Sequence, residues 1–327
     1  MSGRQTNLAL LGLTALAFVT GFGAFSVGTQ TGWVVVVAHS TIGLATLLVA
    51  RAKTSVARRG LARNRSGKAL SISLAVTAIL TVATGLLQVS GLAPNLAVVT
   101  TMQVHVGAGV TLVVLTAIHL FQRPVLPRVA DLSRRNLIRF GGLLGGAGLL
   151  YVGIEAVWGV TSAPASSRRF TGSHRIEDIA DVPATEWLND ADPQLDDSHQ
   201  IALAGSFINV PDLTSFDDSE TATLDCTGGW YTKQTWSGAR LDRFIDPKAG
   251  ESIVVRSVTG YWRRFPIRDA SSLLLASHVD GRRLSSGHGA PVRLVAPGRR
   301  GFWWVKWVDT IEVDDRPSWW QPPLPIA

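Results

Sequence analysis

Two long stretches of this chain carry no charged side chain. Residues 5–50 and 69–122 contain no Asp, Glu, Lys or Arg. Each stretch is long enough for two helices of about 20 residues, the length that crosses the hydrocarbon core of a bilayer. Turn-like segments divide each stretch, and a further apolar stretch follows them. We therefore predict about five transmembrane helices, near residues 7–27, 32–50, 70–89, 97–121 and 140–160.

The charges between the predicted helices indicate their orientation. Two connections are strongly basic, and the other two carry no charge. The basic residues are Arg51, Lys53, Arg58, Arg59, Arg63, Arg65 and Lys68 in the first basic connection, and Arg123, Arg128, Arg134, Arg135 and Arg139 in the second. Basic loops stay cytoplasmic. The pattern predicts a multi-pass protein of the cytoplasmic (inner) membrane of a bacterium, with its N-terminus inside and its C-terminal domain outside.

The net charge has the same origin. The chain carries +7 overall, but residues 1–139 carry +12 and the remainder carries −5. A nucleic-acid-binding protein would need its basic residues on one face of a folded domain. Here they flank apolar helices, so we expect the lipid bilayer as their partner and no nucleic acid.

The second half contains the only cysteine of the chain, Cys226, within Leu-Asp-Cys-Thr-Gly-Gly-Trp. One thiol cannot form an intramolecular disulfide or a site with several thiolates. It can be a single soft ligand to a metal whose other ligands come from a cofactor. Three further motifs follow in order: His288-Gly289-Ala290-Pro291-Val292-Arg293, Pro297-Gly298 and Val305-Lys306-Trp307.

This ordered set, spread over residues 168–313, resembles the molybdopterin-binding domain of the sulfite oxidase family. The resemblance implies that the Cys226 thiolate binds molybdenum and that the dithiolene of the pterin supplies two more sulfurs. It also implies that His288, Arg293 and Lys306 hold the pterin phosphate, an anion that needs cationic groups and backbone donors. The remaining cofactor-binding residues implied by the motifs are Thr227 and Gly289.

The Gly-Tyr pair at Gly260 and Tyr261 also matches the family. It implies a phenol near the metal, where Tyr261 donates a hydrogen bond to an oxo group or a substrate oxygen. The alternative is a half-buried strand tyrosine without a role in the site.

The sequence departs from sulfite oxidases after the cysteine. Those enzymes carry arginines there to bind an anionic substrate, whereas this chain has Thr-Gly-Gly-Trp at 227–230. The residues after Val313 are also too few for their additional C-terminal dimerisation domain. The compact form is more similar to the exported catalytic subunit of bacterial protein-methionine-sulfoxide reductases, which work with a haem-bearing membrane partner. We therefore favour a sulfoxide reductase.

Strand-like segments dominate the second half. We predict strands at 199–210, 252–258, 292–296 and 303–313, a strand ending at 224–226, and a turn with a short helix at 236–245. The predicted fold is a multi-pass all-α membrane domain at 1–130, a twin-arginine-like segment and fifth helix at 131–162, and a strand-rich α+β molybdopterin-binding oxidoreductase domain at 163–327.

Histidines inside predicted transmembrane helices indicate a second cofactor. His39 lies six residues after Trp33, and His105 lies seven residues after Val98. At about 1.5 Å per residue, both lie about 10 Å below the outer surface on parallel helices. Ionisable groups at such positions are rare and usually functional. Two histidines at matching depth are what a b-type haem requires. Room for a macrocycle is left by Gly43, Gly107 and Gly109.

A second haem site is incomplete. His119 follows His105 by 14 residues, a spacing that resembles two-haem membrane cytochromes b. The matching position on the second helix, 14 residues after His39, is Lys53. The alternative for all three histidines is hydrogen bonding between helices.

The segment Ser133-Arg134-Arg135-Asn136-Leu137-Ile138-Arg139 resembles a twin-arginine export signal. That route exports proteins already folded around a cofactor, which a molybdopterin domain requires. The alternative is that the two arginines only anchor the fifth helix on the cytoplasmic side. The resemblance predicts the export machinery as a partner.

Two functions follow from these features. The first is an oxidoreductase that moves an oxygen atom to or from a small or protein-bound substrate, with electrons passing through a membrane haem to or from quinone or another membrane electron-transfer partner. The second is a non-catalytic membrane haem electron carrier with a degenerate outer binding domain. Cys226 favours the first, because a degenerate domain has no need to keep it.

Overall fold

The computed structural model describes residues 3–62, 68–96, 99–124, 127–184, 193–203 and 205–325. The chain divides into two compact units, Met1–His174 and Arg175–Ala327. Arg63 and Arg65 of the first predicted basic connection, and the first two residues of the predicted fourth helix, lie outside the described residues.

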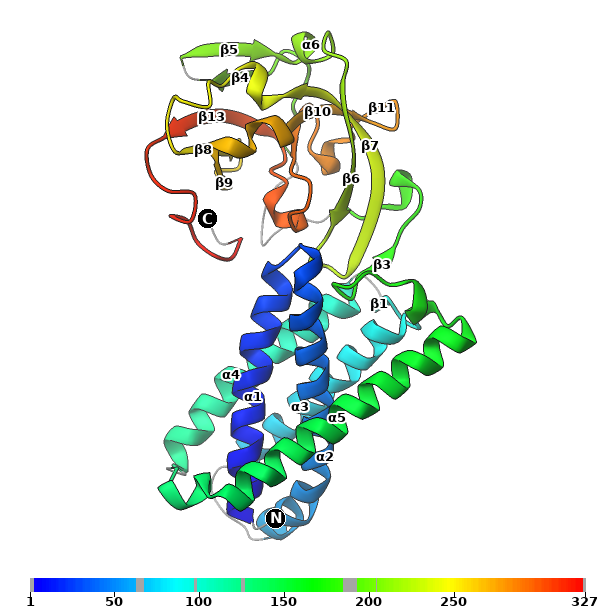
Figure 1. The fold of residues 1–327 in the computed structure, drawn as a ribbon, viewed down its shortest axis with the longest axis vertical. Coiled ribbons are helices and arrows are strands. Elements are labelled where there is room, and N and C mark those ends of the chain that lie inside the picture. The colour runs from blue at the N-terminus through cyan, green and yellow to red at the C-terminus, as the bar shows by residue number, and fades with distance from the viewer. Residues whose placement is uncertain are drawn as a thin grey trace. The chain divides into compact units, whose positions relative to one another are not determined.

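The first unit is built from five long helices (Figure 1). They are α1 (Gly3–Ser26), α2 (Trp33–Ala62), α3 (Lys68–Ser90), α4 (Thr101–Gln122) and α5 (Arg134–Thr161). All five are long and apolar enough to cross a membrane, as predicted. The second candidate span, Gln30–Arg51, agrees with the predicted 32–50, and the helix α2 itself continues through the basic segment to Ala62.

These helices expose much of their apolar surface. Val19 is 65% exposed and Ile79 is 69% exposed. A soluble protein rarely tolerates apolar surface on this scale, so the unit is compatible with a multi-pass membrane protein. Its small buried core consists of Leu13, Ile42, Ala45, Val49 and Ala147.

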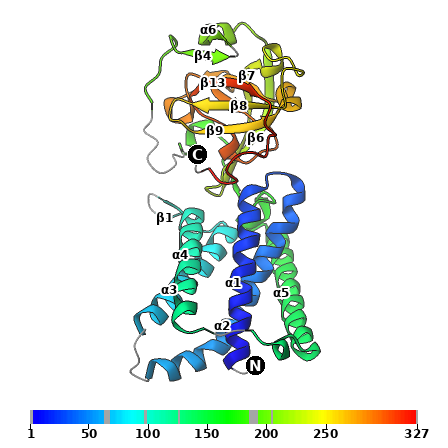
Figure 2. The same cartoon turned by 90° about the vertical axis from the view of Figure 1, so that its left-hand side faces the viewer.

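The helices form two groups, α1 with α2 and α5, and α3 with α4 (Figure 2). Short elements join them: η1 (Gln30–Gly32), the paired strands β1 (Asn95–Leu96) and β2 (Val99–Thr100), and η2 (Val129–Leu132). Thr100 begins α4 with a capping box, in which its hydroxyl accepts from the Gln103 amide and the Gln103 side chain accepts from the Thr100 amide.

Polar contacts gather at one end of this helical unit. Arg4 forms an ion pair with Asp131 at 2.7 Å. The Lys53 ammonium donates to the Asn7 side chain. The start of α1, the distal part of α2 and the segment before α5 therefore lie together, as the predicted topology requires.

The segment after α5 packs at the opposite end of the same unit. It forms η3 (Pro164–Ser167) and then passes the end of α3. There the Gln88 side chain donates to the Gly172 carbonyl at 3.3 Å, and His174 Nε2 contacts the Gln88 carbonyl at 2.6 Å. The division into compact units falls after His174, within β3, whereas the predicted outer domain begins at residue 163.

The second unit contains two sheets, so the predicted strand-rich domain is confirmed (Figure 1). The first sheet has the order β11-β10-β7-β3, with β12 paired to β10 and β6 paired to β7. Its strands are β3 (His174–Arg175), β6 (Asp218–Asp225), β7 (Trp230–Arg240), β10 (Leu274–Val279), β11 (Arg282–Arg283) and β12 (Arg293–Val295).

The second sheet has the order β5-β4-β13-β8-β9. Its strands are β4 (Gln200–Leu203), β5 (Ser206–Asn209), β8 (Ser252–Ser257), β9 (Trp262–Pro266) and β13 (Val308–Asp314). Only the β4–β13 pair in it is parallel. Short helical turns connect the strands: η4 (Ile179–Asp181), α6 (Val210–Leu213), η5 (Leu241–Arg243), η6 (Ile267–Ser272), η7 (Ser286–His288) and η8 (Gly301–Trp303).

Two strand predictions, and one prediction of a turn with a short helix, were wrong in detail. The predicted strand at 199–210 is the hairpin of β4 and β5, because Gly205 adopts φ +88° and reverses the chain. The predicted turn and helix at 236–245 are the end of β7 and a single turn, η5. The predicted strand at 303–313 begins only at Val308, after η8.

Candidate active site

Cys226 lies in a tight turn directly after β6. Its amide donates to the Trp230 carbonyl at 2.9 Å, and Gly229 closes the turn with φ +92°. The Gly228 amide donates to Cys226 Sγ at 3.3 Å. The thiol is buried, with 7% of the residue exposed. The turn therefore fixes the direction of the sulfur with backbone contacts.

A buried ion pair fastens this turn to the loop at residues 297–304. Arg300 Nη1 lies 2.6 Å from Asp225 Oδ1, and both residues are at most 3% exposed. Arg300 Nη2 also donates to the Cys226 carbonyl at 3.2 Å. The guanidinium thus contacts the two residues that end β6 and begin the cysteine turn.

A second turn, at residues 285–293, gathers the other predicted site residues. Arg293 Nη1 donates to the His288 carbonyl at 3.1 Å, and Lys306 Nζ donates to the Gly287 carbonyl at 2.6 Å. Gly289 has φ +101°, and a Cβ there would lie 3.0 Å from the Lys306 Cβ and 3.1 Å from the Arg293 Cβ. Only glycine lets the two cationic side chains approach this closely.

His288 is held by both ring nitrogens. Nδ1 contacts Ser285 Oγ at 2.7 Å, and Nε2 contacts the Val182 carbonyl at 3.1 Å. Burial lowers the pKa of His288, and the neighbouring Arg293 and Lys306 charges lower it further. Burial also lowers the pKa of Arg293 to about 10, against an opposite effect of Cys226. The turn already concentrates positive charge, so the imidazole stays neutral near pH 7.

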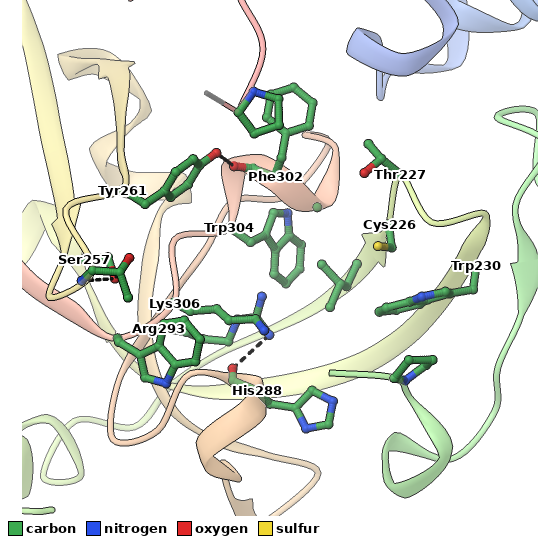
Figure 3. Close-up of a pocket in the computed structure, with 16 residues that line it drawn as sticks. Cys226, Thr227, Trp230, Ser257, Tyr261, His288, Arg293, Phe302, Trp304 and Lys306 are labelled. Atoms are coloured by element: carbon green, nitrogen blue, oxygen red, sulfur yellow. Dashed lines mark hydrogen bonds between the residues drawn. The ribbon is translucent and has the colours of Figure 1, made fainter. Parts of the chain in front are cut away.

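These residues converge on one pocket of the second unit (Figure 3). Cys226, His288 and Arg293 line it, together with the predicted Thr227, Tyr261 and Lys306. Gly289 is not a lining residue, but it lies against Arg293 and Lys306. The remaining wall is largely aromatic or aliphatic: Pro183, Leu224, Trp230, Ser257, Thr259, Gly301, Phe302, Trp304, Trp307 and Pro325.

The Tyr261 hydroxyl is engaged in the pocket wall. It donates to the Phe302 carbonyl (Figure 3). It also accepts a hydrogen bond from Arg263 Nε at 2.6 Å. The predicted hydrogen bond to a substrate oxygen would require this hydroxyl to leave the Phe302 carbonyl.

Three buried donors of the pocket lack a hydrogen-bond partner among the described residues. They are Trp230 Nε1, Trp304 Nε1 and Arg293 Nε. Arg293, 2% exposed, also forms no salt bridge within the described part of the chain. Burying such groups without acceptors is costly. The donor set therefore fits an anionic, acceptor-rich group bound beside the thiol.

The first unit holds the predicted pair of histidines side by side. The rings of His39 and His105 have centroids 5.9 Å apart and are nearly perpendicular. His39 Nδ1 contacts the Ala17 carbonyl at 3.0 Å, and His105 Nδ1 contacts the Thr81 carbonyl at 2.8 Å. Such contacts fix the ring and direct Nε2 elsewhere.

Glycines on neighbouring helices face these rings. A Cβ at Gly21 would lie 3.0 Å from His39 Cε1, and a Cβ at Gly85 would lie 3.0 Å from His105 Cε1. The glycines predicted to leave room for a macrocycle were Gly43, Gly107 and Gly109. Gly21 and Gly85 were not predicted. Their matching places on α1 and α3 become visible only when the two hairpins are compared.

The second unit contains the part of the chain that matches a known protein family. Residues 194–320 match the family model described as "Oxidoreductase molybdopterin binding domain". The chain is 27% identical to the mitochondrial sulfite oxidase of Macaca fascicularis, over 39% of this chain and 32% of that protein. It is 50% identical to the NADPH nitrate reductase of Mycosarcoma maydis over a short match, 14% of this chain and 5% of that protein.

The solved sulfane dehydrogenase SoxCD from Paracoccus pantotrophus is also similar, with 22% identity and a TM-score of 0.36 over 38% of this chain and 40% of that chain. The chain spans about a third of the length of the mitochondrial sulfite oxidases that it matches.

Proposed function

We propose that this chain, whose second unit is a molybdenum-dependent oxidoreductase domain of the sulfite oxidase type, is a membrane-anchored enzyme that transfers an oxygen atom to or from its substrate. The observation that carries the proposal is the single pocket shared by Cys226, His288, Arg293 and Lys306. Cys226 comes from the turn after β6, and His288 and Arg293 come from the turn at residues 285–293. Lys306 comes from the segment before β13.

The pocket residues divide between two tasks in holding the cofactor. Cys226 provides the protein sulfur ligand to the metal. The cations Arg293 and Lys306, with His288, hold the pterin phosphate, and the indole donors of Trp230 and Trp304 face acceptor atoms of the cofactor. When bound, the molybdenum cofactor supplies two-electron oxygen-atom transfer.

The lining favours an uncharged substrate. The only cationic lining residues among those described are Arg293 and Lys306, and both donate to carbonyls of the turn at 287–288. Aromatic side chains, Trp230, Phe302 and Trp304, make up much of the remaining wall. A neutral sulfoxide can bury its apolar groups there, whereas sulfite would have to share cations already committed to the cofactor. Sulfoxide reduction is therefore the favoured reaction.

A substrate screen tests this preference. Purified holoenzyme should oxidise a reduced viologen dye when given dimethyl sulfoxide or methionine sulfoxide. It should oxidise sulfite slowly, or not at all, with an electron acceptor. Rapid sulfite oxidation without sulfoxide turnover would overturn the choice of substrate.

The first unit would carry electrons through a b-type haem between His39 and His105. The adjacent rings, the carbonyl contacts to Nδ1 and the facing glycines support this assignment. Both Nε2 atoms would then serve as axial ligands. His119 has no described histidine partner at its depth, so one haem is proposed. Quinone or another membrane carrier would be the electron partner.

Variants of the helical unit test the haem. His39→Ala or His105→Ala should abolish a low-spin haem spectrum, while His119→Ala should keep most of it. Gly21→Ala should weaken the spectrum because its Cβ would press on the His39 ring, and Gly12→Ala, with nothing within 4 Å of its Cβ, is the matched control. Wild-type protein that binds no haem, even with haem supplied in excess, would contradict the assignment.

We also propose that the chain lies in the bacterial inner membrane with its second unit outside. The basic connections support this orientation. The export machinery would recognise Arg134 and Arg135 at the start of α5.

A further inference from the structure

Arg263 is a buried cation that the proposed chemistry does not use. It lies on β9 and is 0% exposed. No salt bridge involves it among the described residues, and its Nη2 has no hydrogen-bond partner there. A buried guanidinium without a carboxylate is costly. The contacts that Arg263 makes in the folded protein must therefore compensate for its lost hydration.

The contacts of Arg263 join separate parts of the pocket wall. Its Nε donates to the Tyr261 hydroxyl at 2.6 Å, and its Nη1 donates to the Pro322 carbonyl at 2.9 Å. Its guanidinium carbon also lies 5.1 Å from the ring centroids of both Tyr261 and Phe302. These cation–π contacts compensate part of the desolvation. The side chain thus links Tyr261, Phe302 and the C-terminal segment.

The C-terminal segment is fastened to the edge of the second sheet. β9 is the edge strand of that sheet, and the Gln321 side chain bonds to its backbone. Gln321 Oε1 accepts from the Arg264 amide at 3.0 Å, and Gln321 Nε2 donates to the Arg264 carbonyl at 2.8 Å. The side chain thereby satisfies edge groups that an adjacent strand would otherwise pair.

The same segment reaches the active-site pocket. Pro325, three residues beyond the carbonyl held by Arg263, lines the pocket together with Cys226, Tyr261 and Phe302. Tyr261 and Phe302 are the residues whose rings lie against the Arg263 guanidinium. One buried side chain therefore contacts two residues of the wall and the segment that carries a third.

We propose that Pro325 is a fixed wall of the substrate pocket, held there by the segment 321–325, and that Arg263 is the positioning residue that fastens this segment against Tyr261 and Phe302. The wall limits the size of the substituents that a substrate can carry. This inference rests on the proposed sulfoxide reduction for its kinetic test only.

Substrate selectivity of the full-length holoenzyme tests the proposal. Arg263→Lys keeps the charge but loses the planar fork that bonds Tyr261 and Pro322 together. Gln321→Ala releases the segment without touching the buried cation. Both variants should raise kcat/KM for methyl p-tolyl sulfoxide relative to dimethyl sulfoxide by about tenfold, the scale of one pocket contact. The control Arg268→Lys changes an arginine whose side chain is 86% exposed and should leave the ratio unchanged.

Hydrogen–deuterium exchange of the purified chain gives a readout that needs no turnover. In Arg263→Lys and Gln321→Ala, the amides of residues 318–321 and of Leu324, the non-proline positions of this segment, should exchange at least about tenfold faster than in the wild type. If the wild type reduces no sulfoxide but exchange accelerates in both variants, the proposed reaction is wrong. The proposed role of Arg263 in fixing the wall is then still supported. Unchanged exchange in both variants, or altered selectivity in Arg263→Lys alone, would overturn the proposal.

Discussion

At the scale of single residues, buried arginines organise the pocket. Arg293 lines the pocket together with Cys226, Arg263 contacts the C-terminal segment at Pro322, and Arg300 contacts the cysteine turn. Only Arg300 has a carboxylate partner among the described residues, Asp225. The three therefore respond differently to substitution, because removing one member of a buried pair leaves the other charge unpaired.

Arg300→Met should destabilise the second unit by about 3–5 kcal/mol, because the buried Asp225 carboxylate loses the guanidinium that lies 2.6 Å from it. The double variant with Asp225→Asn should recover part of this loss. The control Arg299→Met breaks the more exposed pair with Asp269 and should cost about 0–1 kcal/mol. Thermal unfolding followed by tryptophan fluorescence measures each change. Equal losses in Arg300→Met and Arg299→Met would contradict the role of the buried pair.

The ordered motifs of the sequence identified residues that lie together, while their roles in binding a cofactor stay predictions. Cys226, His288, Arg293 and Lys306 were named from ordered motifs, and the structure gathers them in one pocket. Arg263 and Arg300 were missed as supports of the wall and the turn, because Pro322 and Asp225, to which they bond, lie tens of residues away in the sequence. Such contacts depend on strand register, which an isolated sequence pattern does not specify.

At the scale of elements, long apolar helices were predictable and mixed strands were not. Long apolar segments define α1 to α5 almost by length and composition alone. In β7 the segment Trp-Ser-Gly-Ala-Arg suggested a turn, because serine and glycine are frequent in turns. The structure instead uses Gly238 in mid-strand, where β10 approaches too closely for a side chain.

Gly238→Ala should therefore disrupt the first sheet. The added Cβ would lie 1.9 Å from the Leu275 carbonyl oxygen, which belongs to the paired strand β10. We expect a loss of more than about 3 kcal/mol, at the high end for single substitutions. Ser237→Ala, one residue away on the same strand, is the control. Urea unfolding of the purified protein measures both, and a Gly238→Ala variant as stable as this control would show that the strands separate freely.

At the scale of the whole molecule, the uneven distribution of charge along the sequence was the main basis for predicting two different halves. It separated a basic, helical first half from an acidic, strand-rich second half. The end of the helical unit at His174 was not predictable, because residues 163–174 are short of apolar periodicity and pack through polar contacts such as Gln88 with Gly172.

The proposed export route makes a separable prediction. Arg134→Lys with Arg135→Lys keeps the positive charge, so simple anchoring of α5 should survive. A receptor-read twin-arginine signal should not. A reporter fused after Ala327 should therefore lose its extracytoplasmic activity in the double variant, while Arg123→Lys with Arg128→Lys leaves it intact. Full reporter activity in the first double variant would leave only the anchoring role.

The central claim is that Cys226 binds molybdenum in the pocket of the second unit. X-ray absorption at the molybdenum edge measures the sulfur ligands of the metal directly. Wild-type protein, expressed with molybdate, should contain molybdenum. Any metal retained in Cys226→Ser should have one sulfur ligand fewer, while Thr227→Ala should keep the wild-type sulfur count. Wild-type protein without molybdenum, or the same sulfur count in wild type and Cys226→Ser, would contradict the account.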